Sequence, residues 1–285
     1  MKSNEVYKTM TDILKQLEDK DMFDCIKAWV KGTAAEVGWW DTVLYEVKYG
    51  NDLRKERLTS REFVYKFNKK IKFNSNDIII DIGSGLLPVY GNIINGKEIN
   101  YLPLDPLAYE YKKLYKKYNI NLPVEPSFAI MEDLSSYVSE KVDYVICTNA
   151  MDHSIDPVCA IVECVKVLKQ GGTLLLAHLE SEAEYANYDG LHQWNITNRN
   201  NELVVYNYEK ETNMSKLLSD FCKVEITNIA GEGGRFWNVA KIVKDRDIDI
   251  NVRLDRPSSF YVSMLSSCLM EALGNSNGLY FPCGE

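Results

Sequence analysis

The chain has little histidine and no excess of positive charge. Only 3 of its 285 residues are histidine, and neither a CxxC nor an HxxxH pairing is present. A metal site built on paired ligands is therefore not expected. The formal net charge is -8, so the chain has no global positive field to hold a phosphate backbone. Nucleic acid is not expected as a partner.

Long apolar runs and a disulfide pattern are also missing. No apolar run approaches the roughly 18 residues of a membrane span. The first 20 residues are polar and amphipathic, unlike a signal peptide. The seven cysteines are odd in number and scattered, which is typical of reduced core residues. We therefore expect a cytoplasmic protein without a membrane span.

The composition is that of an ordinary globular protein, with 46% hydrophobic and 26% charged residues. The length suits one principal α/β core with additions. The apolar pattern predicts a helical N-terminal cap over residues 1–72, a main domain over 73–244 and a C-terminal extension over 245–285. A helix over 258–273 is expected within the extension.

Short apolar runs alternate with helices in the main domain, which predicts a parallel sheet with crossover helices. Helices are expected over 107–118, 155–168 and 212–221. The last two strands are close in sequence, so they favour an antiparallel hairpin. The predicted fold class is α/β, with a Rossmann-like, doubly wound, mostly parallel seven-stranded sheet, a C-terminal antiparallel hairpin and a helical N-terminal cap. The predicted strands cover 78–82, 100–104, 127–131, 142–148, 173–178, 223–229 and 237–243.

A glycine-containing loop follows the first predicted strand, in the sequence Asp81-Ile-Gly83-Ser84-Gly85. Two glycines one residue apart allow a sharp turn and a close approach to a ligand. Asp105 ends the second strand, where a carboxylate can accept hydrogen bonds from both ribose hydroxyls. The alternatives are an ordinary turn at the glycines and a helix N-cap at Asp105, with Pro106 at the first helical position.

A dinucleotide does not fit this glycine-containing loop well. Its fingerprint needs a third glycine, which admits a helix whose N-terminus holds the pyrophosphate. Pro88 occupies that position. NAD is therefore not expected.

Three segments resemble, in order, the motifs of class I S-adenosylmethionine-dependent methyltransferases. They are Asp81-Ile-Gly-Ser-Gly, Asp105-Pro-Leu-Ala and Asn149-Ala-Met-Asp-His. The resemblance spans about residues 77–244 and implies S-adenosyl-L-methionine as the cofactor. It implies cofactor contacts for Asp81, Gly83, Ser84, Gly85, Asp105, Pro106, Glu132, Asp133, Asn149 and Ala150. A helix N-cap is the alternative role for Glu132 and Asp133.

Two histidines lie in loops suited to acid–base chemistry. His153 follows Asp152 after the fourth strand, and His192 lies in Gly-Leu-His-Gln-Trp-Asn after the fifth. An unperturbed pKa near 6.5 suits either histidine as a base. The predicted catalytic residues are thus His192, His153 and Asp152. The alternatives are a helix-start residue for His153 and a surface residue for His192, and His178 is expected in the core.

The acceptor is expected to be a small polar molecule methylated on oxygen or nitrogen. The predicted substrate residues are Trp40, Trp194 and Asn195, which offer ring faces and hydrogen bonds that suit a sugar or another precursor of a surface polysaccharide. The rival hypothesis is a non-catalytic subunit, regulatory or for assembly, that binds adenosylmethionine. The sequence specifies no oligomeric state.

Overall fold

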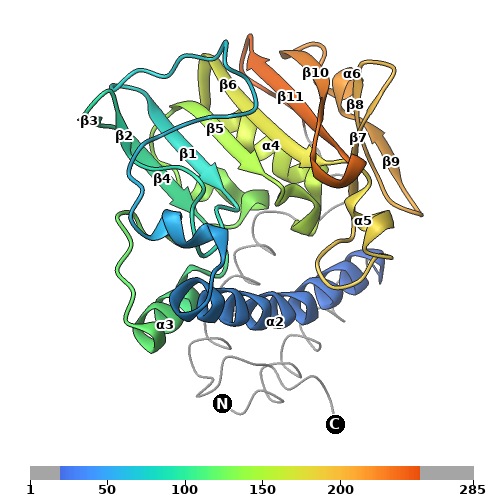
Figure 1. Cartoon of the computed structure of the whole chain (residues 1–285). Helices are drawn as coiled ribbons and strands as arrows, with labels where there is room; N and C mark the ends of the chain where they lie inside the picture. The colour runs from blue at the N-terminus through green and yellow to red at the C-terminus, as the bar shows by residue number, and fades with distance from the viewer. Residues whose placement is uncertain (1–19, 251–285) are drawn as a thin grey trace.

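A six-stranded, mostly parallel sheet forms the centre of the computed structural model, which describes residues 20–250 (Figure 1). The strand order is β10-β11-β6-β5-β1-β4. The strands are β1 (Ile78–Ile82), β4 (Asn100–Leu104), β5 (Val142–Thr148), β6 (Leu168–Leu179), β10 (Cys222–Ala230) and β11 (Phe236–Lys244). The expected helices before residue 20 and over 258–273 lie outside the described residues.

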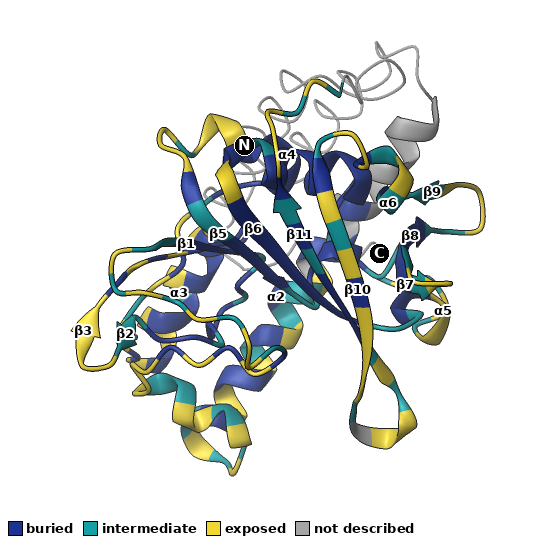
Figure 2. Cartoon of the chain, turned by 90° about the horizontal axis from the view of Figure 1, so that it is seen from above, coloured by how far each residue is buried: buried dark blue, intermediate teal, exposed yellow. Residues whose placement is uncertain are grey.

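The hairpin at the end of the main domain is confirmed. β10 pairs antiparallel with β11, and β11 pairs antiparallel with β6. The pairs β1–β4, β1–β5 and β5–β6 are parallel. The outer edge of β10 is largely exposed (Figure 2). The predicted Rossmann-like α/β fold class is therefore confirmed.

The third of the seven predicted strands, over 127–131, is wrong. Only Ser127 forms a bridge, with Leu104 of β4. The chain then turns into the short 3-10 helix η2 (Met131–Ser136). The sheet consequently has six strands rather than seven.

One face of the sheet packs against a helix, whereas the segment that carries Phe63, Tyr65 and Phe67 covers the other face. α4 (Pro157–Val167) begins where Asp156 accepts hydrogen bonds from the backbone N–H groups of Val158 and Cys159. α3 (Ala108–Tyr118) follows β4. The helix expected over 212–221 is shorter and forms α6 (Met214–Leu217).

The long connection after β6, predicted as a loop over the strand ends, is largely structured. The helix α5 (Glu182–Tyr185) comes first. A separate antiparallel sheet follows, with strands β7 (Asn195–Arg199), β8 (Glu202–Tyr206) and β9 (Glu211–Asn213). β7 and β8 are joined by Asn200 and Asn201, both with positive φ, as a two-residue hairpin turn requires.

The helix α2 (Lys20–Tyr49) runs across the side of the sheet where the loops after β1, β4 and β5 emerge (Figure 1). Its apolar residues Val43, Leu44 and Val47 pack in one cluster with Leu107 and Leu114. The 3-10 helix η1 (Leu53–Leu58) follows α2, and a small ribbon of β2 (Ile93–Ile94) and β3 (Lys97–Glu98) lies beyond β1. Within 20–250, no helix has the length and apolarity needed to cross a membrane.

Candidate functional site

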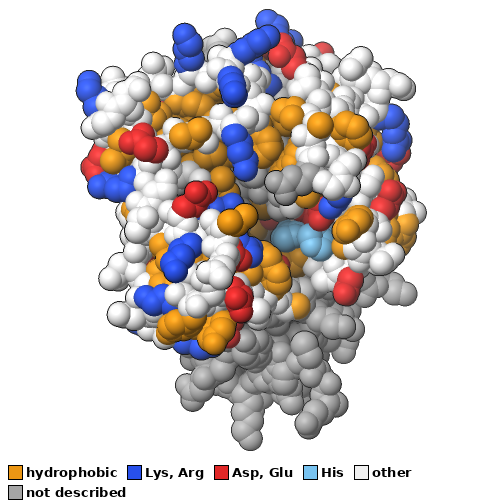
Figure 3. Space-filling view, viewed as in Figure 1, with side chains coloured by type: hydrophobic (Ala, Val, Ile, Leu, Met, Phe, Trp, Pro, Cys, Tyr) orange, Lys and Arg blue, Asp and Glu red, His pale blue; other side chains and the backbone are white. Residues whose placement is uncertain are grey.

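A cavity of about 340 Å³ lies between α2 and the loops that follow the parallel strands. This volume is within the range of small-molecule sites, and its position agrees with the rule that open α/β sheets bind ligands at the carboxyl ends of their strands. Histidine side chains are visible in the hollow on this face of the molecule (Figure 3).

The glycine loop after β1 forms one wall of the cavity. Gly83 and Gly85 both have a φ of 69°, in the left-handed region that favours glycine. A Cβ on Gly83 would lie 2.5 Å from the Cβ of Ala150, and one on Gly85 would lie 2.8 Å from Cζ2 of Trp40. Both glycines are therefore required by backbone conformation and by close packing.

Asp105 at the end of β4 holds this loop in place. Its Oδ2 accepts a hydrogen bond of 2.9 Å from the Gly85 N–H, and its Oδ1 accepts one of 2.9 Å from the Leu107 N–H. Burial raises the pKa of Asp105 to about 6, although both hydrogen bonds favour the ionised form. The carboxylate joins the glycine loop to the start of α3, and it also lines the cavity.

Asp81 takes a different position from Asp105. It is buried within β1, accepts a hydrogen bond of 2.6 Å from the Tyr101 hydroxyl, and is not among the cavity-lining residues. Burial raises the pKa of Asp81 to about 7. Its contacts support the sheet beneath the glycine loop.

Glu132 and Asp133 also separate in the structure. Glu132 lines the cavity, and its Oε1 accepts hydrogen bonds from the backbone N–H groups of Ile155 and Asp156, just before α4. Burial raises its pKa to about 7. Asp133 points elsewhere and accepts a hydrogen bond from the Ser136 hydroxyl at 2.8 Å. It is not among the cavity-lining residues.

The end of β5 brings Asn149 and Ala150 to the cavity. Asn149 has a φ of 51°, which asparagine tolerates better than most residues. Its N–H donates to the Ala177 carbonyl at 2.8 Å, and its Oδ1 accepts from the Leu179 N–H at 3.0 Å. These bonds tie the turn after β5 to β6. Ser84 and Pro106 line the cavity as well.

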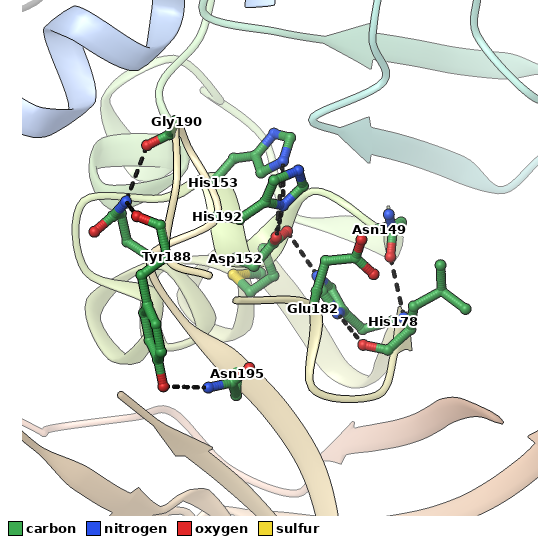
Figure 4. A network of polar contacts seen from close by, with 12 residues as sticks. Asn149, Asp152, His153, His178, Glu182, Tyr188, Gly190, His192 and Asn195 are labelled. Carbon is green, nitrogen blue, oxygen red and sulfur yellow. Dashed lines mark hydrogen bonds and ion pairs between the residues drawn. The ribbon is translucent and has the colours of Figure 1, made fainter. Parts of the chain in front are cut away.

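All three histidines of the chain gather around the Asp152 carboxylate (Figure 4). Asp152 Oδ1 lies 2.7 Å from His178 Nε2, and Oδ2 lies 2.6 Å from His192 Nδ1. His153 Nε2 lies 3.2 Å from His192 Nδ1 and 3.7 Å from Asp152 Oδ2. We call Asp152, His153, His178 and His192 the histidine cluster. His153 lines the cavity.

His178 is the fully buried member of the histidine cluster. Its Nδ1 lies 2.9 Å from the Leu179 carbonyl oxygen, which can only accept, and its Nε2 lies against the carboxylate. Both nitrogens therefore donate when Asp152 is ionised. Burial disfavours the imidazolium, but Asp152 more than offsets it and raises the pKa of His178. The pKa of His192 is raised in the same way.

Burial by itself would raise the pKa of Asp152. The charges of His153 and His178, and the hydrogen bonds from His178 and His192, reverse this effect and hold the pKa well below its usual range. The carboxylate is therefore an anion whose partners are all side chains.

Two predicted substrate residues lie away from the cavity. Trp194 is buried in the main hydrophobic core. Asn195 is fully buried, where its Nδ2 donates to the Tyr188 hydroxyl at 3.0 Å and its Oδ1 accepts from the Glu184 N–H at 3.1 Å. Neither is a cavity-lining residue. Their contacts shape the loop that carries His192.

The third predicted substrate residue, Trp40, lines the cavity. Its indole Nε1 is buried and has no hydrogen-bond partner among the described residues. A buried donor without a partner is costly, so this N–H suits a hydrogen bond to a bound molecule.

Sequence reasoning missed three cavity-lining residues of α2, Trp29, Thr33 and Glu36. With Trp40 they fall at positions i, i+4, i+7 and i+11, which is one face of a helix. That spacing was the available signal. Trp29 Nε1 donates to the His153 carbonyl at 2.9 Å, and a Cβ on Gly32 would lie 2.7 Å from Leu191. α2 therefore contacts the histidine end of the cavity as well as the glycine loop.

Comparison with known proteins gives one family match. Residues 81–176 match the family model described as a methyltransferase domain. No curated protein sequence matches the chain. The matched range begins at Asp81 and includes the glycine loop, Asp105, Asp152 and His153.

Several solved structures are similar to parts of the chain. The YcgJ protein from Bacillus subtilis is 13% identical, with 62% of this chain and 96% of that chain covered and a TM-score of 0.40. The trans-methyltransferase CalH, in complex with SAH, is 15% identical, with coverages of 60% and 52% and a TM-score of 0.44. The 1,6-didemethyltoxoflavin-N1-methyltransferase of Burkholderia thailandensis is 12% identical, with coverages of 60% and 72% and a TM-score of 0.36.

Proposed function

We propose a reaction for this chain, which carries a class I S-adenosylmethionine-dependent methyltransferase domain and uses S-adenosyl-L-methionine as its cofactor. The family and the cofactor that the sequence motifs predict are confirmed by the match over residues 81–176. The proposed reaction moves the cofactor's methyl group to an oxygen or nitrogen atom of a small polar acceptor. A sugar or another precursor of a surface polysaccharide is the acceptor class we propose first.

The observation that carries this proposal is one cavity with two chemically different ends. The glycine loop and Asp105 line one part of the wall, and His153, from the histidine cluster, lines another. A methyl transfer needs a site for the donor and, beside it, a group that takes a proton from the acceptor. The cavity offers both.

The residues at the glycine end fit the cofactor. Gly85 lies so close to Trp40 that a Cβ would fill the space between them, and the Trp40 indole N–H has no partner among the described residues. We propose that Gly83, Gly85, Asp105 and Asn149 hold the cofactor, with Glu132 and Trp40 beside it. Asp105 uses one lone pair of each carboxylate oxygen for the backbone, and the second lone pair can accept from a ribose hydroxyl. Bound here, the cofactor supplies an electrophilic methyl group on a sulfonium.

The histidine cluster acts on the acceptor in this proposal. His153 or His192 accepts the acceptor's proton, and the buried Asp152 carboxylate orients both imidazoles and stabilises the charge that forms. A positioned general base typically contributes about 10²–10⁴-fold to a rate. The leaving thioether is neutral and needs no proton.

Thermal unfolding with added ligands tests the cofactor assignment first. We expect S-adenosylmethionine and S-adenosylhomocysteine to stabilise the full chain, by about 2.7 kcal/mol at 100 times the dissociation constant. The Asp105→Ala variant should lose this stabilisation. Stabilisation by NAD alone would overturn the proposal.

Release of S-adenosylhomocysteine in the presence of an acceptor panel then tests catalysis. The panel contains free sugars, sugar nucleotides, small amines and short RNA. We expect turnover with a member of the small polar set. Cofactor binding without turnover on any acceptor would favour the non-catalytic adenosylmethionine-binding subunit instead.

A further inference from the structure

We infer that Asp152, His153 and His192 form a binding site for one divalent transition-metal ion at the acceptor side of the cavity. The role of the ion in catalysis rests on the proposed function, but its binding does not. No metal site is predicted here from the sequence, because positions 152, 153 and 192 do not have the paired spacing of common metal motifs. The fold brings them together.

Three potential ligand atoms converge in the histidine cluster (Figure 4). They are Asp152 Oδ2, His153 Nε2 and His192 Nδ1, and their separations are 2.6, 3.2 and 3.7 Å. Ligand atoms bound to one ion at about 2.1 Å lie roughly 3.0–3.4 Å apart for angles of 90–109°. The circle through the three atoms has a radius of about 1.9 Å, so one point can lie about 2.1 Å from all of them. Side-chain shifts of a few tenths of an ångström would bring the 2.6 and 3.7 Å separations into the expected range.

A hydrogen bond accounts for the contact between Asp152 and His192, but not for the approach of His153 to the same nitrogen. His192 Nδ1 carries either one proton or one lone pair in the plane of the ring. Its two neighbours, Asp152 Oδ2 and His153 Nε2, lie in directions about 80° apart, so one N–H cannot point at both. A cation between the three atoms would use a lone pair from each.

Hydrogen bonds from neighbouring groups orient the potential ligand side chains, as is typical of metal sites. Asp152 Oδ1 is occupied by His178 Nε2 at 2.7 Å, and His178 Nδ1 is fixed on the Leu179 carbonyl. The carboxylate is thus oriented with Oδ2 turned toward the other two histidines. Such outer hydrogen bonds typically hold metal ligands in place. Trp29 fixes the backbone of His153 from α2.

The ligand types indicate the class of ion. Two imidazole nitrogens and one carboxylate oxygen suit zinc, iron, cobalt or nickel, whereas magnesium and calcium prefer oxygen ligands throughout. Three protein ligands leave at least one position open. Because His153 lines the cavity, an open position there would be reached from the acceptor side. Binding of the ion would use the imidazole lone pairs of His153 and His192 that otherwise take the acceptor's proton. The ion would instead lower the pKa of a bound hydroxyl, so the site favours an acceptor that is methylated on oxygen.

Cobalt titration tests the site directly. The full chain is freed of metal with a chelator and titrated with Co²⁺ while its visible d–d absorption is followed. We expect saturation at one equivalent, without the charge-transfer absorption that a cysteine ligand would produce. His153→Ala and His192→Ala should each weaken binding at least 100-fold. Both side chains are partly exposed, at 20% and 31%, so both variants should fold, which thermal unfolding checks.

Two further variants separate ligand loss from general effects. Asp189→Asn removes an exposed carboxylate from the loop that carries His192, and it should leave cobalt binding unchanged. His178→Asn removes a supporting side chain and should weaken binding about 10- to 100-fold. Absence of the d–d absorption, equal binding by the histidine variants, or a thiolate charge-transfer band would each overturn the inference.

Titration of the same samples with S-adenosylhomocysteine distinguishes failure of this site from failure of the proposed function. Binding of S-adenosylhomocysteine without binding of cobalt would reject the metal site alone. Cobalt binding without adenosylhomocysteine binding would support the metal site and reject the proposed function.

Discussion

The two ends of the cavity hold their carboxylates in different ways. At the glycine end, Asp105 and Glu132 accept hydrogen bonds from backbone N–H groups. At the histidine end, Asp152 is bound by the side chains of His178 and His192, with His153 close by. Backbone contacts fix the shape of the glycine end, whereas the histidine end is built from groups that can exchange protons or bind an ion. The difference suggests that the glycine end binds and the histidine end reacts.

Removal of the Asp152 charge should produce the largest effect on turnover. In Asp152→Asn the imidazoles lose their anionic partner, so we expect turnover to fall by about 10²–10⁴-fold. The dissociation constant for S-adenosylhomocysteine should stay within about threefold, because the glycine end is unchanged. Steady-state kinetics and calorimetric titration measure the two quantities. Asp189→Asn, in the neighbouring loop, is the matched control, and equal turnover in both variants would contradict the assignment.

A methyl group added to the glycine loop should weaken ligand binding at the glycine end of the cavity. Gly85→Ala adds a Cβ 2.8 Å from Trp40 at a φ of 69°, and we expect S-adenosylhomocysteine to bind about 100-fold more weakly. Gly96→Ala is the control, because its φ is 75° but nothing lies within 4 Å of the added Cβ. It reproduces the backbone strain without the clash, and it should bind the ligand as the wild type does. Equal losses in the two variants would point to strain alone.

The unpaired indole N–H predicts a smaller effect. Trp40→Phe keeps an aromatic ring but removes the donor, and a hydrogen bond of about 0.5–1.5 kcal/mol corresponds to up to about tenfold in affinity. We expect that loss for S-adenosylhomocysteine in calorimetric titration. Tyr45→Phe removes an exposed donor from the same helix and should have no effect. An unchanged affinity in Trp40→Phe would remove this residue from the cofactor site.

A separate effect concerns stability rather than ligand binding. Burial raises the pKa of Asp81 from 3.8 to about 7, so the folded protein binds this proton more tightly than the unfolded chain. The free energy of unfolding should therefore fall as the pH rises from about 4 to about 7. Asp81→Asn keeps an acceptor for Tyr101 and removes the titration. We expect its unfolding free energy to decline less over this range, by up to about 1.4 kcal/mol per pH unit, in denaturant titrations at pH 4 and pH 7.

The two ends also differ in how far the sequence predicted them. Gly83, Gly85 and Asp105 follow strands that are adjacent in the sheet, so their meeting at one wall of the cavity could be predicted from short motifs and strand order. His178 and His192 lie 26 and 40 residues beyond Asp152, and they meet it only because β6 pairs with β5 and the later loop returns to the same edge. The sequence placed His178 in the core, which is correct for its burial, but the pattern could not show its contact with Asp152.

Two misjudged regions of the fold have local causes. The predicted strand over 127–131 is limited to one bridge at Ser127, because the chain then turns into the 3-10 helix η2 at Met131. No strands are predicted from the sequence where β7, β8 and β9 form a sheet. Asn200 and Asn201 nevertheless lie between two segments in which apolar and polar residues alternate. That pair is a recognisable hairpin signal. Trp194 and Asn195 belong to this structured region, which explains why they pack inward.

S-adenosylhomocysteine binding, measured side by side for the wild type, Gly85→Ala and Asp152→Asn, tests the division of the cavity most directly. We expect Gly85→Ala to bind the ligand about 100-fold more weakly and Asp152→Asn to bind it nearly as well as the wild type. A strong loss in Asp152→Asn together with normal binding in Gly85→Ala would contradict the division of the cavity into a cofactor end and a reacting end.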